Sequence, residues 1–350
     1  MRPALYVRHH RRSFLAMALS AGAAQSFAQC QMSRFGTPYK CQKLVLGASG
    51  EKGSYDSESV DCPFVFRHNG SFYMTFIAFD GIGYQTGLAV SDDLVHWQKQ
   101  GAILPRDPSS SVLKYNAALN WILRENGLHS PGNLKKVDGY FLGAYHAYPN
   151  EGYERGAAVI GLCRSKDLHN WEAEPPALTP ESGAAWEKGG LYKPCLLKYQ
   201  STYYIFYNAK NQTEGNWHEQ TGVAYSRDLT KWTRYSGNPI IRNGPPGSPD
   251  EHFASDPCVL QDRGQWAFYY FGLDAKGVAR DLLATGPDLF HATKCGVVID
   301  VGKPGSIDST YAHKPSLIRY RGDLYHFYCA VAPGNRHPIR GISVARSLPW

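Results

Sequence analysis

The sequence lacks several of the patterns that identify common protein classes. It has no CxxC or paired Cys/His spacing, which removes the usual zinc and thiol-redox motifs. It has no clustered run of Lys and Arg, so a nucleic-acid-binding surface is not indicated. No apolar stretch approaches the roughly eighteen residues of a membrane-spanning helix. With 43% hydrophobic and 19% charged residues, the chain is also not of a disordered type.

The residues that are abundant favour strands and tight turns. Aromatic residues make up 13% of the 350 residues, and there are 35 Gly and 22 Pro but only four Met. Aromatic side chains fit pleated, half-buried surfaces, and Gly and Pro mark turns. An all-β fold is therefore the first expectation.

The N-terminus has the features of an export signal. Residues 11–15 read Arg-Arg-Ser-Phe-Leu and resemble a twin-arginine signal, an apolar stretch covers residues 14–24, and small residues precede a cleavage site after Ala28. We expect residues 1–28 to be removed and residues 29–350 to form one exported domain, periplasmic or extracellular. The segment contains four Arg and no acid, so its loss lowers the formal charge from +7 to +3. A lipoprotein attached at Cys30 is the alternative.

Most of the eight cysteines are expected to be buried free thiols. Three of them lie beside prolines in apolar runs, where a small hydrophobic side chain fits well. A protein of the twin-arginine class also folds before it leaves the reducing cytoplasm. The best candidates for disulfide formation are Cys30, Cys41 and Cys329.

An internal repeat becomes visible when prolines are used as anchors. Each unit has an apolar strand through a proline, a polar turn, and a second strand rich in aromatics, which is a β-hairpin pattern. The spacings between anchors are 68, 63, 63 and 58 residues. The anchors are Pro63, Pro131, Pro194, Pro257 and Pro315.

A second motif follows in each unit and predicts two further strands. It reads Gly-x-x-x-Ser-x-Asp-Leu-x-x-Trp in full copies at residues 87–97, 161–171 and 222–232, with weaker copies at 281–290 and 341–350. Four strands in each of five units predict a five-bladed β-propeller. The last copy stops before its fourth strand, so we expect the segment at residues 42–47 to close the fifth blade.

In a propeller the first strand of each blade lines the central channel. The residues just before the five prolines are therefore expected to lie around one site in the channel, and their polar character indicates a binding pocket. They are Asp61-Cys62, His129-Ser130, Tyr192-Lys193, Ser255-Asp256 and His313-Lys314.

These units resemble those of the five-bladed propeller glycoside hydrolases, the group that contains families 43, 32, 62, 117 and 130. The resemblance covers residues 38–350 and depends on the segment from Asp61 to Tyr73, on the Ser-x-Asp-Leu-x-x-Trp repeats, and on Ser255-Asp256-Pro257. It implies one acid at the start of the first blade, a second acid beside a proline on a later inner strand, and a separate proton donor.

The resemblance assigns roles to residues at matching positions. Asp61 is expected to be the general base or nucleophile and Asp256 the residue that tunes the proton donor, since glycosidic cleavage uses a pair of carboxyl groups. Glu187 is the first choice for the acid, with Glu251 and His313 as alternatives, because some relatives resembling family 117 use histidine.

Further residues are candidates for substrate binding. Lys193 and Lys314 could hold sugar hydroxyls or a carboxylate, or simply neutralise the buried acids. Lys193 also stands where family 43 or 32 would show an acid. The other candidates are His129, His146, and the tryptophans Trp121, Trp186 and Trp217, which could stack on sugar rings.

The sequence thus predicts an exported glycosidase acting on poly- or oligosaccharides, with no cofactor, no nucleic-acid partner and no membrane contact after signal removal, as a monomer. Two alternatives stay open. One is a phosphorylase, in which Lys193, Lys314 or Arg280 would hold phosphate. The other is a glycan-binding propeller without catalysis, because fold does not determine function.

Overall fold

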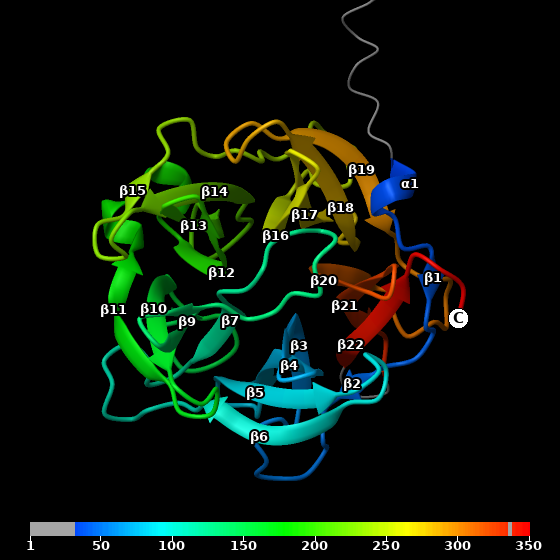
Figure 1. Cartoon of the computed structure of the whole chain (residues 1–350), viewed down its shortest axis with the longest axis horizontal. Helices are drawn as coiled ribbons and strands as arrows, with labels where there is room; N and C mark the ends of the chain where they lie inside the picture. Colours follow the sequence, from blue (N-terminus) through cyan, green and yellow to red (C-terminus); the bar gives the residue numbers. More distant parts are fainter. Residues whose placement is uncertain (1–31, 335–337) are drawn as a thin grey trace, which may run out of the picture.

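The computed structural model describes residues 32–334 and 338–350, and in this part the chain is all-β, as expected. Apart from α1 (Met32–Phe35) and the short helices η1 (Pro180–Ser182) and η2 (Ala185–Glu187), every regular element is a strand. The strands form successive antiparallel groups around a central axis (Figure 1). No helix among these residues is long and apolar enough to cross a membrane. The expected export signal and Cys30 lie outside the described residues.

The groups follow one another in chain order. The first contains β3 (Ser59–His68), β4 (Ser71–Phe79), β5 (Tyr84–Ser91) and β6 (Gln98–Leu104). The second contains β7 (Ala118–Ile122), β8 (Lys136–Val137), β9 (Tyr140–Ala147), β10 (Val159–Ser165) and β11 (Glu172–Leu178). The third contains β12 (Gly190–Tyr199), β13 (Thr202–Lys210), β14 (Glu219–Ser226) and β15 (Thr233–Arg234). The fourth contains β16 (Phe253–Asp262), β17 (Gln265–Leu273), β18 (Ala279–Gly286) and β19 (Thr293–Ile299). The last contains β20 (Tyr311–Tyr320), β21 (Asp323–Ala332) and β22 (Ile339–Arg346).

The last group is completed by the N-terminal segment. β1 (Tyr39–Lys40) and β2 (Leu46–Gly47) both pair antiparallel with β22. Between them, the backbone N–H groups of Cys41 and Val45 donate to the carbonyls of Val344 and Ile342 at 2.9 and 2.8 Å. The two ends of the chain thus share one sheet, which covers an edge that would otherwise be free to pair with another chain.

The repeat motifs are turn signals with clear physical roles. Asn69 and Gly70 connect β3 and β4 with φ values of 48° and 94°, the pattern of a type I′ hairpin. In the Ser-x-Asp-Leu motif, Ser91 Oγ accepts the backbone N–H of Leu94, and Asp93 Oδ1 accepts those of Val95 and His96. Leu94 is buried with a φ of 68°, so the side-chain caps hold a strained turn in place.

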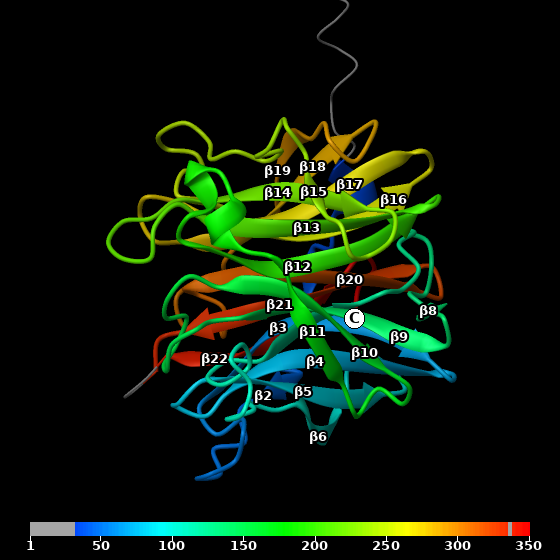
Figure 2. The ribbon, with the colours of Figure 1, turned by 90° about the vertical axis from the view of Figure 1, so that its left-hand side faces the viewer.

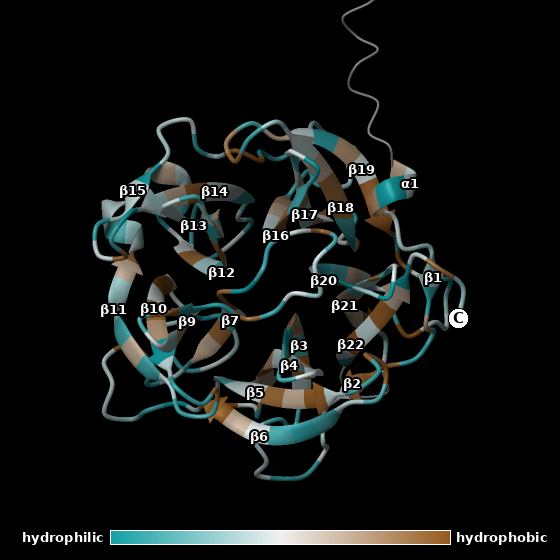
Figure 3. Cartoon of the chain, in the orientation of Figure 1, coloured by the Kyte–Doolittle hydropathy of each residue, from teal (hydrophilic) through white to brown (hydrophobic). Residues whose placement is uncertain are grey.

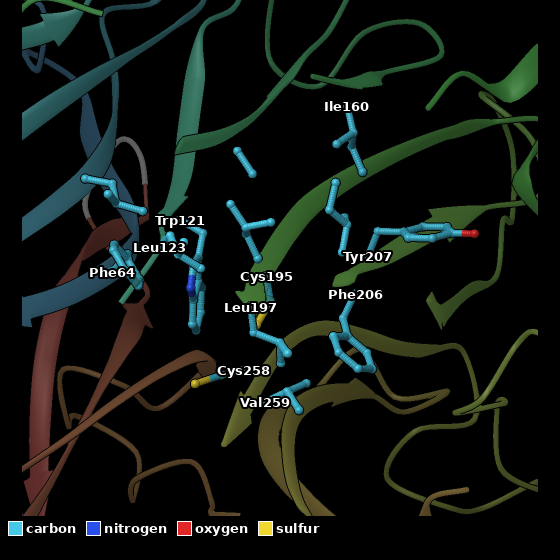
Figure 4. Packing of buried hydrophobic residues seen from close by; sticks show 14 of the residues in the cluster. Phe64, Trp121, Leu123, Ile160, Cys195, Leu197, Phe206, Tyr207, Cys258 and Val259 are labelled. Carbon is cyan, nitrogen blue, oxygen red and sulfur yellow. The ribbon is translucent and has the colours of Figure 1, made fainter. Parts of the chain in front are cut away.

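Successive strands are stacked in pairing order, as β12, β13 and β14 show in Figure 2. The outer strand β6 alternates exposed and half-buried residues over its first part, which is hydrophilic in Figure 3. The inner strands are buried along almost their whole length. Figure 4 shows their side chains converging in the core, with Phe64, Trp121, Cys195 and Cys258 supplied by four different groups.

The second group differs from the prediction. Its inner strand is β7, and the segment around Pro131 is not a strand at all. Residues 123–135 instead cross the central channel (Figure 1), where Leu128 N–H donates to the Gln261 carbonyl and Arg67 N–H to that of Gly132. The proline anchor was misleading because the short hairpin of β8 and β9 turns at Asp138 and Gly139 with the same left-handed backbone as the true repeats. We call residues 123–135 the plug.

The cysteine predictions are partly corrected. Cys41 and Cys329, which were expected to pair, are free thiols. The thiols beside the prolines, at Cys62, Cys195 and Cys258, are buried and free.

Candidate active site

Irregular pairing shapes the inner strands at one end of the channel. In β3, β12, β16 and β20 the register shifts at the residue before the anchor proline, which forms a β-bulge. These four residues have φ values of 50°, 51°, 53° and 69°, a region that side chains other than Gly rarely adopt. They are Cys62, Lys193, Asp256 and Lys314.

The four bulge residues line one cavity of about 180 Å³. This volume is below the roughly 300–1,000 Å³ of pockets that enclose drug-sized ligands. Aromatic rings, carboxyl groups and cations share the wall. The remaining lining residues are Ile77, Tyr84, His146, Tyr153, Glu154, Tyr192, Glu219, Phe253, Phe271, Leu273, Ala279, Tyr311, His313 and Arg340.

Two carboxyl groups of this wall, those of Asp256 and Glu219, lie on either side of the buried amide of Asn208. Asn208 reaches Glu219 Oε2 at 3.4 Å in one orientation of its amide and Asp256 Oδ1 at 3.2 Å in the other. Burial raises the pKa of Asp256 to about 7, although Lys314 and Lys193 act in the opposite direction. Burial also raises the pKa of Glu219. With a pKa of about 7, Asp256 is partly protonated at neutral pH.

Glu219 is held firmly by its neighbours. Its two oxygens accept hydrogen bonds from Trp217 Nε1 at 2.9 Å and from Ser255 Oγ at 2.7 Å. These donors fix the side chain at the start of β14. Trp217 therefore holds Glu219 in place, and the ring of Trp217 does not line the cavity.

Glu154 supplies a third carboxyl group from a different direction. It lies in the loop between β9 and β10, is half-buried, and accepts one hydrogen bond from the hydroxyl of Tyr84 at 2.9 Å. Its second oxygen has no hydrogen bond to the described residues. Glu154 thus has one oxygen available to a bound molecule.

Asp61 lies directly behind the wall and is 4% exposed. It accepts hydrogen bonds from Lys314 Nζ at 2.8 Å, Arg340 Nη1 at 2.6 Å and the backbone N–H of Cys62 at 2.7 Å. Burial alone would raise the pKa of Asp61, but the charges of Lys314 and Arg340 outweigh it and hold this pKa well below its usual value. Asp61 is thus a permanent anion that fixes two cations in the wall.

The two histidines of the wall are neutral at physiological pH. Burial, aided by Lys314, lowers the pKa of His313 to about 3. Burial and the charges of Lys193 and Lys314 hold the pKa of His146 well below its usual value. A neutral imidazole can both donate and accept a hydrogen bond, which suits sugar hydroxyls.

The cavity unites half of the residues singled out from the sequence. Asp256, His313, Lys193, Lys314 and His146 line it, and Asp61 contacts it through its two cations. Three further candidates do not line the cavity. They are Arg280, considered as a phosphate ligand, and Trp121 and Trp217, considered for stacking on sugar rings. Arg280 is engaged by Asp274 and Asp300, and Trp121 is in the core.

The structure does not bring Glu187 to the cavity. It is 1% exposed beside η2 and accepts hydrogen bonds from Tyr207 Oη at 2.7 Å and Arg234 Nε at 2.8 Å. Trp186 stacks on the ring of Tyr207 with centroids 6.0 Å apart and also lies outside the wall. The sequence alone does not reveal this position, because the partner Arg234 is 47 residues away.

His129 and Glu251 are also elsewhere. His129 belongs to the plug and its Nε2 is 2.9 Å from Asp262 Oδ1, at the end of β16 remote from the bulge. Glu251 accepts the backbone N–H of Gly247 at 2.8 Å in the loop before β16. Neither side chain lines the cavity.

The sequence analysis missed Glu219, Glu154 and Arg340. Glu219 had a signal, since it lies three residues before the repeat glycine Gly222, and Tyr84 lies three before Gly87. Both are the first residues of third strands, and both line the cavity. Glu154 and Arg340 have no counterpart in the repeats. Among the described residues, no cluster of three or more His, Cys, Asp or Glu could hold a metal ion.

Comparisons with known proteins identify the group that this chain resembles. The sequence profile of the "Glycosyl hydrolases family 32 N-terminal domain" matches residues 125–283, which are less than half of the chain. A levanase of Bacillus subtilis (strain 168) is 30% identical over 142 residues, 37% of this chain and 18% of the levanase. A fructan 1-exohydrolase of Leymus chinensis is 24% identical over 254 residues, 70% of this chain and 38% of that enzyme. The chain spans less than two fifths of either relative.

Solved structures agree over most of the chain. One described as "Glycoside hydrolase" superposes with a TM-score of 0.76 at 25% identity, covering 91% of this chain and 95% of the other. A thermostable family-43 glycoside hydrolase gives a TM-score of 0.58 at 16% identity and covers 81% and 88%, which shows a shared fold. The expected resemblance to propeller glycoside hydrolases is confirmed, and these similarities support a glycosidase.

Proposed function

We propose that this protein is an exported five-bladed propeller glycosidase that cleaves glycosidic bonds in the cavity at the bulge end of its channel. The observation that carries this proposal is the set of three carboxyl groups in one small wall, in which burial raises the pKa of Asp256 to about 7 and Glu154 keeps one oxygen without a hydrogen bond to the described residues. Glycosidic cleavage needs one protonated and one ionised carboxyl group at the same bond. The completion of the last strand group by β1 and β2 supports the five-bladed ring.

Asp256 supplies the general acid. Asp256 has a pKa of about 7, which lies in the range in which a carboxylic acid is both protonated and able to give up its proton. Glu219 raises it further by like-charge interaction. The proton would pass to the oxygen of the leaving group as the glycosidic bond breaks.

Glu154 supplies the second carboxyl group of the reaction. Its free oxygen would attack the anomeric carbon or activate a water molecule, while Tyr84 holds the other oxygen. In this proposal Asp61, the base or nucleophile expected from the sequence, is a positioning residue, because its hydrogen bonds hold Lys314 and Arg340 at the wall.

The cavity size favours the binding of a single sugar unit, since about 180 Å³ is below the roughly 300–1,000 Å³ of pockets that enclose drug-sized ligands. Fructans are the first polymers to test, because a levanase and a fructan 1-exohydrolase are among the relatives. Export is supported by the basic and apolar pattern of residues 1–28.

The test is sugar release from levan, inulin, arabinan, xylan, galactan and mannan, with and without inorganic phosphate. The full chain is compared with Glu154→Gln and Asp256→Asn, and Glu251→Gln is the control for an amide in place of a carboxyl group outside the wall. We expect release by the wild type and the control and a loss of about 10²–10⁴-fold in both wall variants. Release that is unaffected in both, in folded protein, would overturn the assignment.

A further inference from the structure

The ammonium group of Lys193 is buried at the cavity without a partner. Lys193 is 7% exposed and lines the wall. Its backbone N–H donates to His146 Nδ1 at 3.3 Å, but its Nζ has no hydrogen bond or ion pair to any residue that the structure describes. The other cations of the wall, Lys314 and Arg340, are both bound to Asp61.

An unpaired buried charge costs free energy, so such a lysine is rare unless something pairs with it. Asp256 does not fulfil this role, although both lysines act on it electrostatically. No ion pair within 4.0 Å joins Lys193 to a carboxylate in the described part of the chain. The β-bulge at Lys193 moreover holds this residue in a strained backbone conformation that directs its side chain to the cavity.

The surroundings of Lys193 suit an anion. Its ring neighbours Tyr192 and His146 are uncharged at neutral pH and offer polar atoms to a ligand. Lys314 lies in the same wall and adds positive charge, and the raised pKa of Asp256, about 7, reduces the negative charge nearby.

We propose that the cavity recognises a carboxylate carried by the sugar, and that Lys193 is the residue that pairs with it. This inference rests on the proposed glycosidase function and adds glycans that contain a uronic acid to its candidate substrates. A charge-assisted hydrogen bond in a buried site contributes about 1.5–3 kcal/mol, which corresponds to roughly ten- to one-hundredfold in affinity.

The test measures binding of glucuronate and galacturonate to the full chain by calorimetry, with glucose and galactose as neutral counterparts and inorganic phosphate as a separate arm. We expect both uronates to bind at least tenfold more tightly than the neutral sugars. Lys193→Met should remove this preference, Lys193→Arg should retain part of it, and Lys231→Met, at an exposed lysine outside the wall, should not change it.

The possible results distinguish failure of the uronate inference from failure of the proposed glycosidase function. Equal binding of uronates and neutral sugars by the wild type overturns the inference, whether or not Lys193→Met folds, and leaves glycosidase activity on neutral glycans untouched. Phosphate that binds through Lys193 and is needed for sugar release also overturns it, since the anion is then a reactant. Preferential uronate binding without sugar release from any glycan supports the inference and counts against the proposed function.

Discussion

The two ends of the central channel are built from the same inner strands but differ in how their charges are satisfied. At the plug end, Arg124 is 1% exposed and donates to the carbonyls of Val65 and Leu317 at 2.6 and 2.7 Å. Its guanidinium also lies over the rings of Phe64 and Trp121. At the bulge end, the ammonium group of Lys193 has no ion-pair partner among the described residues, and burial raises the pKa of Asp256 to about 7. The plug end is thus filled by side chains that stabilise the fold, and the bulge end has charged groups that are available to a ligand.

The difference has a structural origin. The plug exists because the chain between β7 and β9 is long enough to cross the channel and bond to β3, β16 and β20. The bulges exist because a proline follows the residue at each register shift and cannot donate to the ladder. Irregular backbone thus produces a structural core at one end and a polar cavity at the other.

The largest stability effect is expected at the plug. Arg124→Met would leave two buried carbonyls without a donor, and we expect a loss of about 3–5 kcal/mol in the free energy of unfolding. Denaturant unfolding followed by tryptophan fluorescence measures it. Arg321→Met, at a hairpin turn, is the control, and equal midpoints for the two variants would contradict the role given to the plug.

Loss of the contacts that close the ring is expected to lower the free energy of unfolding slightly less. Leu46 is 5% exposed in the β2 strand and packs in the core near β22, so Leu46→Ala should cost about 2–4 kcal/mol. Leu348→Ala is the matched control, because Leu348 is 49% exposed. An unchanged melting temperature in the Leu46 variant would show that the N-terminal segment does not stabilise the ring.

A smaller stability effect is expected outside the channel. Glu187→Gln weakens the hydrogen bonds to Tyr207 and Arg234, and we expect a loss of about 1–2 kcal/mol. Thermal unfolding measures this loss. A variant as stable as the wild type would mean that this buried carboxylate is not maintained for structure.

The pH dependence of sugar release tests the role of Asp256 at the bulge end. The groups facing Asp256 are Lys314, Lys193, Glu219 and Asp61, and its pKa is about 7. The acid must be protonated to act, so kcat/KM should be highest below about pH 7 and fall as the pH rises through it. In Asp256→Asn this alkaline limb should disappear from the residual activity. A limb that persists at the same pH would assign the proton to another group.

The sequence predicts the parts of this molecule that repeat. The prolines and the Ser-x-Asp-Leu motif identify the hairpins and the wall positions at Lys193, Asp256 and Lys314, because each motif has a local backbone role. The plug, Glu154 and Arg340 do not repeat, and their positions depend on contacts between distant segments. The position of Glu187 outside the cavity wall could not be predicted, because the sequence does not distinguish a loop carboxylate at the channel from a buried partner of Arg234.

The most direct test of the account is sugar release by Glu154→Gln and Asp256→Asn compared with Glu187→Gln, each measured below its own unfolding temperature. We predict that the two cavity variants lose at least about a hundredfold in kcat while their stability stays near that of the wild type. Glu187→Gln should show the reverse, with lower stability and sugar release within a few-fold of the wild type. Loss of release in Glu187→Gln together with unchanged release in both cavity variants would contradict the location of the chemistry at the bulge end.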